Sequence, residues 1–175
     1  MRKYAASTCC ILGLWLGLIA SAPAATVQRD YLDHGGSTCR GARPLDNDSL
    51  QFTPKGVRNI GSKPVFVTCD FNVAPNVPNL NPAVGIDAVN IAFLNLTSSD
   101  VSVRCTLVSG ILHVTTSSSK TTVAERNGGA AGVLSWIAEF DNGGKRIPAP
   151  ALSCSLPANV EITYTLVTTT QDVGQ

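Results

Sequence analysis

The chain carries little charge and almost no histidine. Charged residues make up 14% of its 175 residues, and His34 and His113 are its only histidines. It has no block of lysine or arginine, and its formal net charge of +1 is close to neutral. This balance argues against nucleic acid or an anionic membrane as a partner. Heptads, internal repeats and a convincing helical period are also absent, which leaves a β-rich composition.

Long apolar runs are missing, apart from one near the N-terminus. Two basic residues precede an apolar stretch over residues 9–20, and Ala22-Pro23-Ala24 has the small residues of a cleavage site. Residues 1–24 are therefore predicted to be a signal peptide that is cleaved after Ala24. The stretch is shorter than the roughly 20 residues that a membrane span needs. We expect a secreted or periplasmic protein with a single domain over residues 25–175 and no membrane span.

No Cys-x-x-Cys pair is present, and no histidine stands at a zinc-site spacing from a cysteine. Beyond the predicted signal peptide the chain has four cysteines, Cys39, Cys69, Cys105 and Cys154. An even number in an exported chain predicts two disulfides, for which three pairings are possible. We favour Cys39–Cys69 and Cys105–Cys154, because sequential pairing is the simplest. We expect each bond to contribute about 3–4 kcal/mol on the chain-entropy model and to help hold two sheets face to face.

Two neighbouring stretches show the clearest strand patterns. Val101–Val108 alternates strictly, with Val101, Val103, Cys105 and Leu107 on one side, which is typical of a strand with one buried face. Ile86–Leu96 is largely apolar on both sides and is predicted to lie in the middle of a sheet. The turn Thr97-Ser98-Ser99-Asp100 is expected to join the two strands as a hairpin.

Further strands are expected between turns rich in glycine, proline and asparagine. They are Leu50–Thr53, Gly56–Ile60, Val65–Phe71, Gly110–Thr116, Lys120–Glu125, Val133–Phe140 and Val160–Val167. Gly110–Thr116 and Lys120–Glu125 are expected to pair around Ser117-Ser118-Ser119. In the last strand, Val160, Ile162, Tyr164 and Leu166 are expected to share a face.

Residues 25–48 are polar and glycine-rich, and they are predicted to form an irregular N-terminal arm. Short strands at about 10-residue spacing, separated by turn signals, are typical of an all-β fold. We predict an antiparallel β-sandwich of about eight or nine short strands, stabilised by two disulfides.

Motifs for catalysis or metal binding are weak. His34 begins a His-Gly-Gly sequence, but the Gly-x-Ser-x-Gly elbow of a hydrolase is absent. Asp46 and Asp48 offer oxygens at alternate positions, as a calcium loop does, without the glycine and distal glutamate of an EF-hand. His113 is expected to be a sheet-surface residue.

Other acidic residues flank turns. Glu125, Glu139 and Asp141 would have to meet in space to act as the carboxylate pair of a glycosidase. Asn95-Leu96-Thr97 matches a glycosylation sequon, a pattern that also arises often by chance. We predict no catalytic residue, no cofactor and no metal site.

Proline is concentrated in one loop, Asn72–Gly85, which contains Pro75, Pro78 and Pro82. Three prolines so close together forbid a helix or a central strand. The loop has about 14 residues, which is longer than most connections in a compact domain, and such loops often bind partners. The candidate contact residues are Asn76, Val77, Asn79, Leu80 and Asn81.

Several short motifs occur in a familiar order. They are Gly56-Val57-Arg58-Asn59, Val67-Thr68-Cys69, Val103-Arg104-Cys105-Thr106-Leu107, Leu152-Ser153-Cys154-Ser155-Leu156-Pro157 and Ile162-Thr163-Tyr164. In this order the chain resembles a group of short, exported, four-cysteine proteins of Gram-negative bacteria with no assigned function. The resemblance covers about residues 38–167. It implies export and disulfides, and it brings no catalytic or ligand-binding residues.

These observations predict a secreted or periplasmic, non-enzymatic β-sandwich that acts by surface recognition or as a structural component. Its partner would be a protein or a glycan. One alternative is a small exported hydrolase that uses Asp46, Asp48, Glu125 or Asp141. The other alternative is a protease inhibitor that presents the proline-rich loop on a disulfide-bonded scaffold.

Overall fold

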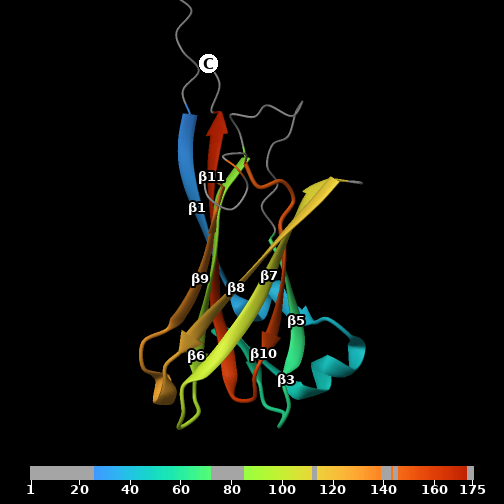
Figure 1. The fold of residues 1–175 in the computed structure, drawn as a ribbon, viewed down its shortest axis with the longest axis vertical. Helices are drawn as coiled ribbons and strands as arrows, with labels where there is room; N and C mark the ends of the chain where they lie inside the picture. The colour runs from blue at the N-terminus through green and yellow to red at the C-terminus, as the bar shows by residue number, and fades with distance from the viewer. Residues whose placement is uncertain (1–25, 72–84, 112–113, 139–142, 144–145, 173–175) are drawn as a thin grey trace, which may run out of the picture.

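A computed structural model describes residues 26–71, 85–111, 114–138, 143 and 146–172. Two antiparallel sheets pack face to face as a sandwich (Figure 1), which confirms the predicted fold class. The described residues form eleven strands instead of the expected eight or nine. Within these residues, no helix is long and apolar enough to cross a bilayer.

One sheet has six strands in the order β3-β4-β11-β6-β9, with β1 also paired to β11. These strands are β1 (Thr26–His34), β3 (Leu50–Thr53), β4 (Gly56–Asn59), β6 (Gly85–Asn95), β9 (Gly132–Ile137) and β11 (Val160–Asp172). β6 occupies one edge of β11, while β4 and β1 pair with successive parts of the other edge. β11 is therefore bonded to three strands.

The second sheet has five strands in the order β2-β5-β10-β7-β8. They are β2 (Cys39–Gly41), β5 (Val65–Asp70), β7 (Val101–Ile111), β8 (Val114–Ala124) and β10 (Ala151–Leu156). Among the helical segments that lie wholly within the described residues are α1 (Gly35–Thr38), η1 (Pro44–Ser49) and η2 (Arg126–Gly128), which connect strands.

The core between the sheets is made by the alternating apolar residues that the sequence predicts. Val103, Cys105 and Leu107 of β7 are buried, and so are Val65, Val67 and Cys69 of β5. β6 lies between β11 and β9, as expected for a strand that is apolar on both sides. Trp136 and Phe93 are the largest fully buried side chains of the described residues.

Residues 25–48 do not form the irregular arm that the sequence indicates. From Thr26 onward they contain β1, α1, β2 and most of η1, and β1 pairs with β11 over its whole length. The period-2 signal is missing because Thr26–Asp30 is exposed on both sides of the strand. Pairing to β11, and not burial of a face, defines this strand.

β6 and β7 are not a hairpin, because they belong to different sheets. The connection between them is an arch held by Asn95, which is buried. Its amide Nδ2 donates to the carbonyl oxygens of Ser99 (2.7 Å) and Ala124 (3.0 Å), and its Oδ1 accepts from the Thr97 amide. With a side chain that is 1% exposed and fully bonded, Asn95 is not accessible for glycosylation in the folded chain.

The β4–β5 connection is a second arch of the same kind. Asn59, also buried, donates from Nδ2 to the carbonyl oxygens of Lys63 and Leu156, both at 2.9 Å, and accepts from the Gly61 amide. Leu156 belongs to the five-stranded sheet, as does Ala124. Each asparagine thus joins the end of a strand in one sheet to a strand of the other.

Ser117-Ser118-Ser119 is not a turn but the middle of the single strand β8, which pairs with β7 from Val114 to Ala124. The three serines resemble a turn in sequence. In the structure, Ser119 instead forms a 2.7 Å hydroxyl–hydroxyl bond with Thr106 of β7.

A β-bulge at Thr163 reverses the faces of β11. The register shifts between Ile162 and Tyr164, so that one residue of β11 has no opposite residue on β6. The expected burial holds up to Ile162, but beyond it Thr165 and Val167 are buried instead. The prediction for Tyr164 and Leu166 is therefore wrong, and both are only half-buried.

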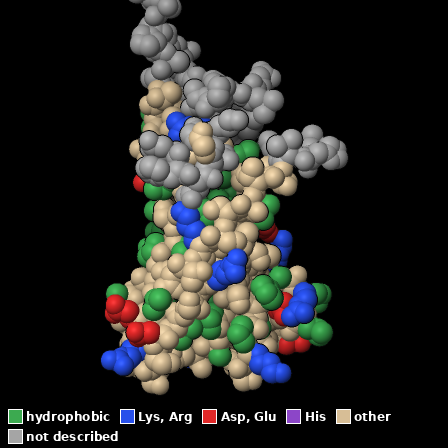
Figure 2. Space-filling model, viewed as in Figure 1, with side chains coloured by type: hydrophobic (Ala, Val, Ile, Leu, Met, Phe, Trp, Pro, Cys, Tyr) green, Lys and Arg blue, Asp and Glu red, His purple; other side chains and the backbone are tan. Residues whose placement is uncertain are grey.

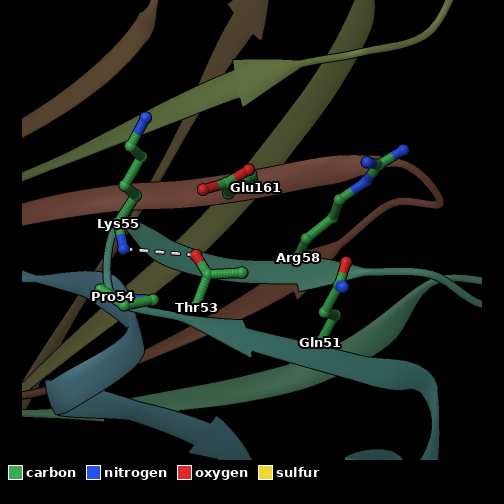
Figure 3. Close-up of a pocket in the computed structure, with 6 residues that line it drawn as sticks. All are labelled: Gln51, Thr53, Pro54, Lys55, Arg58 and Glu161. Carbon is green, nitrogen blue, oxygen red and sulfur yellow. Dashed lines mark hydrogen bonds between the residues drawn. The ribbon is translucent and has the colours of Figure 1, made fainter.

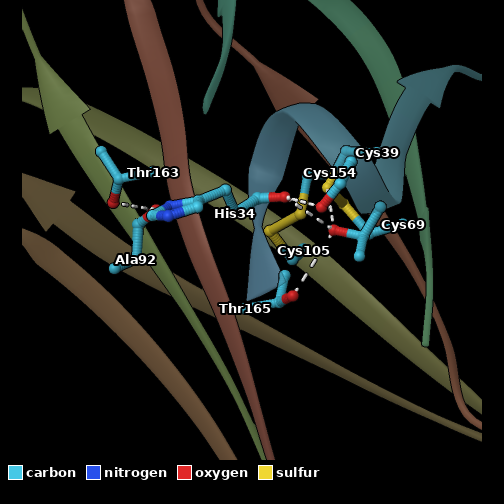
Figure 4. Close-up of a disulfide and its surroundings, with 10 residues drawn as sticks. His34, Cys39, Cys69, Ala92, Cys105, Cys154, Thr163 and Thr165 are labelled. Carbon is cyan, nitrogen blue, oxygen red and sulfur yellow. Dashed lines mark hydrogen bonds between the residues drawn. A yellow bond between two sulfur atoms is a disulfide. The ribbon is translucent and has the colours of Figure 1, made fainter. Parts of the chain in front are cut away.

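Both disulfides have the predicted pairing, Cys39–Cys69 and Cys105–Cys154. Each joins residues directly opposite one another on adjacent strands, β2 with β5 and β7 with β10 (Figure 4). The expectation that they hold the two sheets together is wrong, because both lie within the five-stranded sheet. Their spacing in sequence gave no information about which sheet each cysteine occupies.

Candidate functional site

A polar hollow opens where the β3–β4 hairpin meets β11 on the outer face of the six-stranded sheet (Figure 3). It has a volume of about 400 Å³ and is lined by Gln51, Thr53, Pro54, Lys55, Arg58 and Glu161. Strand register explains why these residues meet: Gln51 lies opposite Arg58, and Arg58 lies opposite Glu161. Pro54 and Lys55 form the turn between β3 and β4.

The floor of the hollow is held by the turn itself. Thr53 Oγ1 donates to the Gly56 carbonyl oxygen (3.2 Å) and accepts from the amides of Lys55 (3.3 Å) and Gly56 (3.1 Å). A Cβ on Gly56 would lie 2.4 Å from the Ile162 carbonyl oxygen and 2.6 Å from a carboxylate oxygen of Glu161. Glycine is therefore required for the hairpin to approach β11 this closely.

The charged groups of the hollow are not paired with one another. Arg58 donates from Nη2 to Asn159 Oδ1 (2.9 Å), but its buried Nε has no hydrogen-bond partner among the described residues. Within the same part of the chain, Lys55 and Glu161 form no salt bridge. The hollow thus offers two cations, one carboxylate and an amide to a polar ligand.

The groups that line this hollow decide which reactions it could support. Glycoside hydrolysis requires two carboxyl groups across the scissile bond, and Glu161 is the only carboxylate that lines the hollow. Its lining contains neither histidine nor cysteine, so a nucleophile activated by an adjacent imidazole is not formed there.

A second, smaller hollow of about 280 Å³ lies beside the Cys39–Cys69 disulfide. It is lined by Ser37, Thr38, Cys39, Arg40, Asp70 and Phe71. Its two charged groups already form an exposed salt bridge, with Arg40 Nη2 and Asp70 Oδ2 2.6 Å apart. It therefore has less to offer a ligand than the hollow at β11.

Asp46, one of the predicted acidic ligands, has a structural role. Arg43 donates to its carboxylate from Nη2 (2.9 Å), Nε (3.1 Å) and the backbone amide (3.1 Å). These side-chain hydrogen bonds from the Arg43 guanidinium lower the pKa of Asp46 below its ordinary value. Asp48 is exposed in the same segment, and the described residues contain no group of three acidic, histidine or cysteine side chains that could hold a metal ion.

The other predicted site residues are not brought together. Glu125 accepts from the Ala130 amide at 3.2 Å and fixes the turn around η2, while Asp46 belongs to η1 on the opposite side of the sandwich (Figure 1). The His34 side chain is exposed, and its carbonyl oxygen accepts from the Ser37 hydroxyl at the start of α1. His113, Glu139, Asp141 and the contact residues Asn76, Val77, Asn79, Leu80 and Asn81 lie outside the described residues.

The residues of the β11 hollow were not among the candidates from sequence. Gln51, Arg58 and Glu161 are polar positions on three separate strands. Their alternation with apolar residues marks them as outward-facing, but only the register of β3, β4 and β11 shows that they are neighbours.

The fold and the hollow define an antiparallel β-sandwich that is cross-linked within one sheet and carries a polar surface site. No protein-family model matches the chain, and no curated protein matches it at a significant level. Among solved structures, it is similar to part of the exo-β-1,3-galactanase from Phanerochaete chrysosporium, which was solved with galactose. The TM-score is 0.41 at 13% identity, and the match covers 81% of this chain but only 29% of the galactanase chain.

Proposed function

We propose that this protein is a secreted or periplasmic, non-enzymatic recognition module that binds a polar protein or glycan partner in the β11 hollow. The observation that carries the proposal is the set of Lys55, Arg58 and Glu161, which form no salt bridge with one another among the described residues. Arg58 and Glu161 lie opposite one another on β4 and β11, and Lys55 lies in the β3–β4 turn beside them. Charged groups held in this way are preorganised to form charge-assisted hydrogen bonds to a ligand.

The compartment is supported by the disulfides. Two disulfides are typical of chains that fold in an oxidising environment, such as the periplasm or the extracellular space. The predicted signal peptide over residues 1–24 leads to the same compartment.

The proposal is tested by screening the purified exported protein on peptide and glycan arrays and measuring Kd for the strongest ligand. Charge-assisted hydrogen bonds contribute about 1.5–3 kcal/mol, so Arg58→Ala and Glu161→Ala should each weaken binding by roughly 10–100-fold. Lys63→Ala is the matched control, because Lys63 is an exposed cation in the next turn of the chain and does not line the hollow.

A deletion of Val77–Asn81 distinguishes binding in the hollow from binding by the proline-rich loop. Full binding by the deletion variant, together with loss in Arg58→Ala, is the expected result. If the deletion abolishes binding and the two point variants retain it, the hollow is not the binding site. Turnover of a glycan or peptide on the array would contradict the non-enzymatic role.

A further inference from the structure

The outer face of the five-stranded sheet carries hydroxyl groups in register across four strands. Thr68 of β5 lies opposite Ser153 of β10, Ser153 lies opposite Thr106 of β7, and Thr106 lies opposite Ser119 of β8. The next outward-facing row, two residues along each strand, contains Phe66, Ser155, Arg104 and Thr121 in the same strand order. We call these eight residues the hydroxyl platform.

The platform is open to solvent and has a regular repeat. All eight side chains are exposed or half-buried. Neighbouring strands of a sheet lie about 4.8 Å apart, and outward-facing residues on one strand repeat every 7 Å or so, about twice the rise per residue. Hydroxyl groups thus recur across the strands at close to the length of one sugar ring.

The two disulfides lie on the opposite side of this same sheet. Cys105–Cys154 joins β7 to β10 between the two rows, and Cys69 is adjacent in sequence to Thr68. Cross-links between neighbouring strands hold the spacing of the rows. Because a rigid surface loses little freedom on binding, such preorganisation favours an ordered, repetitive ligand.

The charge of the platform indicates what kind of ligand it fits. Arg104 is its only charged residue, and the space-filling view shows a surface over β7, β8 and β10 that is mostly uncharged (Figure 2). At the border of the sheet, Arg40 and Asp70 neutralise each other in their salt bridge. A polyanion would therefore find one cation, whereas an uncharged ligand with many hydroxyls would be matched in charge and in hydrogen-bonding groups.

We propose that the hydroxyl platform binds an extended, uncharged polysaccharide that lies across the strands. Phe66, which is 53% exposed, offers an apolar ring to the face of a sugar. The serine and threonine hydroxyls and the Arg104 guanidinium supply donors and acceptors for sugar hydroxyls. This site is separate from the β11 hollow, which lies on the other sheet.

The test is a depletion assay on insoluble cellulose, chitin and β-1,3-glucan, with binding isotherms for the exported protein. Phe66→Ser and Thr106→Lys should each weaken binding to the retaining polysaccharide by about tenfold or more, because one removes the stacking ring and the other places a long cation in the row of hydroxyls. Leu32→Ser on β1 is the matched control, since Leu32 is 62% exposed on the other sheet. Circular dichroism checks that each variant is folded, and Ser119→Lys on the edge strand β8 replaces Thr106→Lys if that variant unfolds.

Four results would overturn the proposal. The first is a lack of retention on all three polysaccharides. The second is retention that Phe66→Ser and the lysine variants leave unchanged. The third is binding that is seen only with an anionic polysaccharide such as alginate and that salt abolishes. Such binding would be due to the charge of Arg104 alone. Loss of retention in Arg58→Ala would show that the β11 hollow, and not the platform, takes the glycan.

Discussion

At the scale of single residues, the described part of the chain buries one carboxylate, Asp46. Burying a charge is costly unless it is paired and hydrogen-bonded, and Arg43 supplies three hydrogen bonds to it. The pair closes the first turn of η1, and Asn47 extends it by accepting from the Gly41 amide at 2.8 Å. Asp46 is therefore part of the structure that positions η1 beside β2.

Asp46→Asn should reduce the acid sensitivity of the protein. The Arg43 guanidinium lowers the pKa of Asp46 in the folded state, so its stabilisation is present above the ordinary aspartate pKa and is lost as the pH falls through the lowered value. Asp46→Asn should melt at a lower temperature than wild type at neutral pH, and should lose less stability on acidification. Thermal unfolding measured from neutral pH to below the ordinary aspartate pKa tests both effects. Asp48→Asn is the control, because Asp48 is exposed. Equal acid dependence in all three proteins would contradict the role of the pair.

The sequence pointed to Asp46 and Asp48 as possible metal ligands, but it did not reveal the role that either residue has in the structure. Alternating acidic residues are compatible with a calcium loop, a catalytic carboxylate or a helix start. Arg43, three residues before Asp46, decides between these, since a 3-10 turn places residues i and i+3 together. The sequence shows that a residue is polar, but its hydrogen-bond partner depends on the local backbone geometry.

At the scale of strands, both disulfides reinforce one sheet and none joins the two sheets. Cys39–Cys69 holds the three-residue strand β2 against β5, and Cys105–Cys154 joins two strands of the sheet interior. The sandwich itself depends on the apolar core and the arches. Loss of a disulfide therefore acts first on the five-stranded sheet and its outer face.

Cys105→Ala and Cys154→Ala should be equally damaging, and the double variant should be no worse than either one. Closing a loop of 49 residues stabilises the folded state by about 4 kcal/mol on the chain-entropy model. Chemical denaturation under non-reducing conditions measures the free energy of unfolding for the three variants. A double variant that shows the sum of both losses would mean that the two cysteines are not partners. Cys39→Ala is the comparison for the shorter loop.

Strands with one buried face could be predicted from sequence, and the sheet to which each belongs could not. β5 and β7 show strict alternation, and β5 matches the prediction closely, whereas β7 continues past Val108 to Ile111, which had been predicted to belong to the next strand. β1 and the middle of β8 were missed because their exposed polar residues resemble loops. β6 and β7 look like a hairpin until Asn95 is seen to bond across the sandwich. Similarly, an extra residue at Thr163 changes the faces of β11 without any mark in the sequence.

At the scale of the whole molecule, buried asparagines link the two sheets at the arches. Asn59 and Asn95 each satisfy carbonyl oxygens of a turn and of a strand in the opposite sheet. The bonds to the strand carbonyl oxygens of Leu156 and Ala124 are buried. The two arches are separate connections, β4–β5 and β6–β7, so they share no hydrogen-bonded group.

Asn59→Ala and Asn95→Ala should each destabilise the protein by roughly 1–3 kcal/mol, because each leaves buried polar groups unsatisfied. The losses should add in the double variant, in contrast to the cysteine pair, since the two sites share no partners. Urea denaturation measures them, with Ser98→Ala in the exposed part of the β6–β7 arch as control. If Ser98→Ala destabilised the protein as much as Asn95→Ala, the effect would come from the turn and not from the Asn95 side-chain amide.

The position of β11 has a consequence for how this protein folds as it is made. β11 binds β1, β4 and β6, yet it is synthesised after every other strand described here. Until it emerges, β1 has no partner strand and β4 pairs only with β3. Cys39 and Cys69 can already meet in the nascent chain, whereas Cys105 must wait for Cys154. Completion of the six-stranded sheet is thus a late event that depends on distant contacts, and distant contacts form slowly.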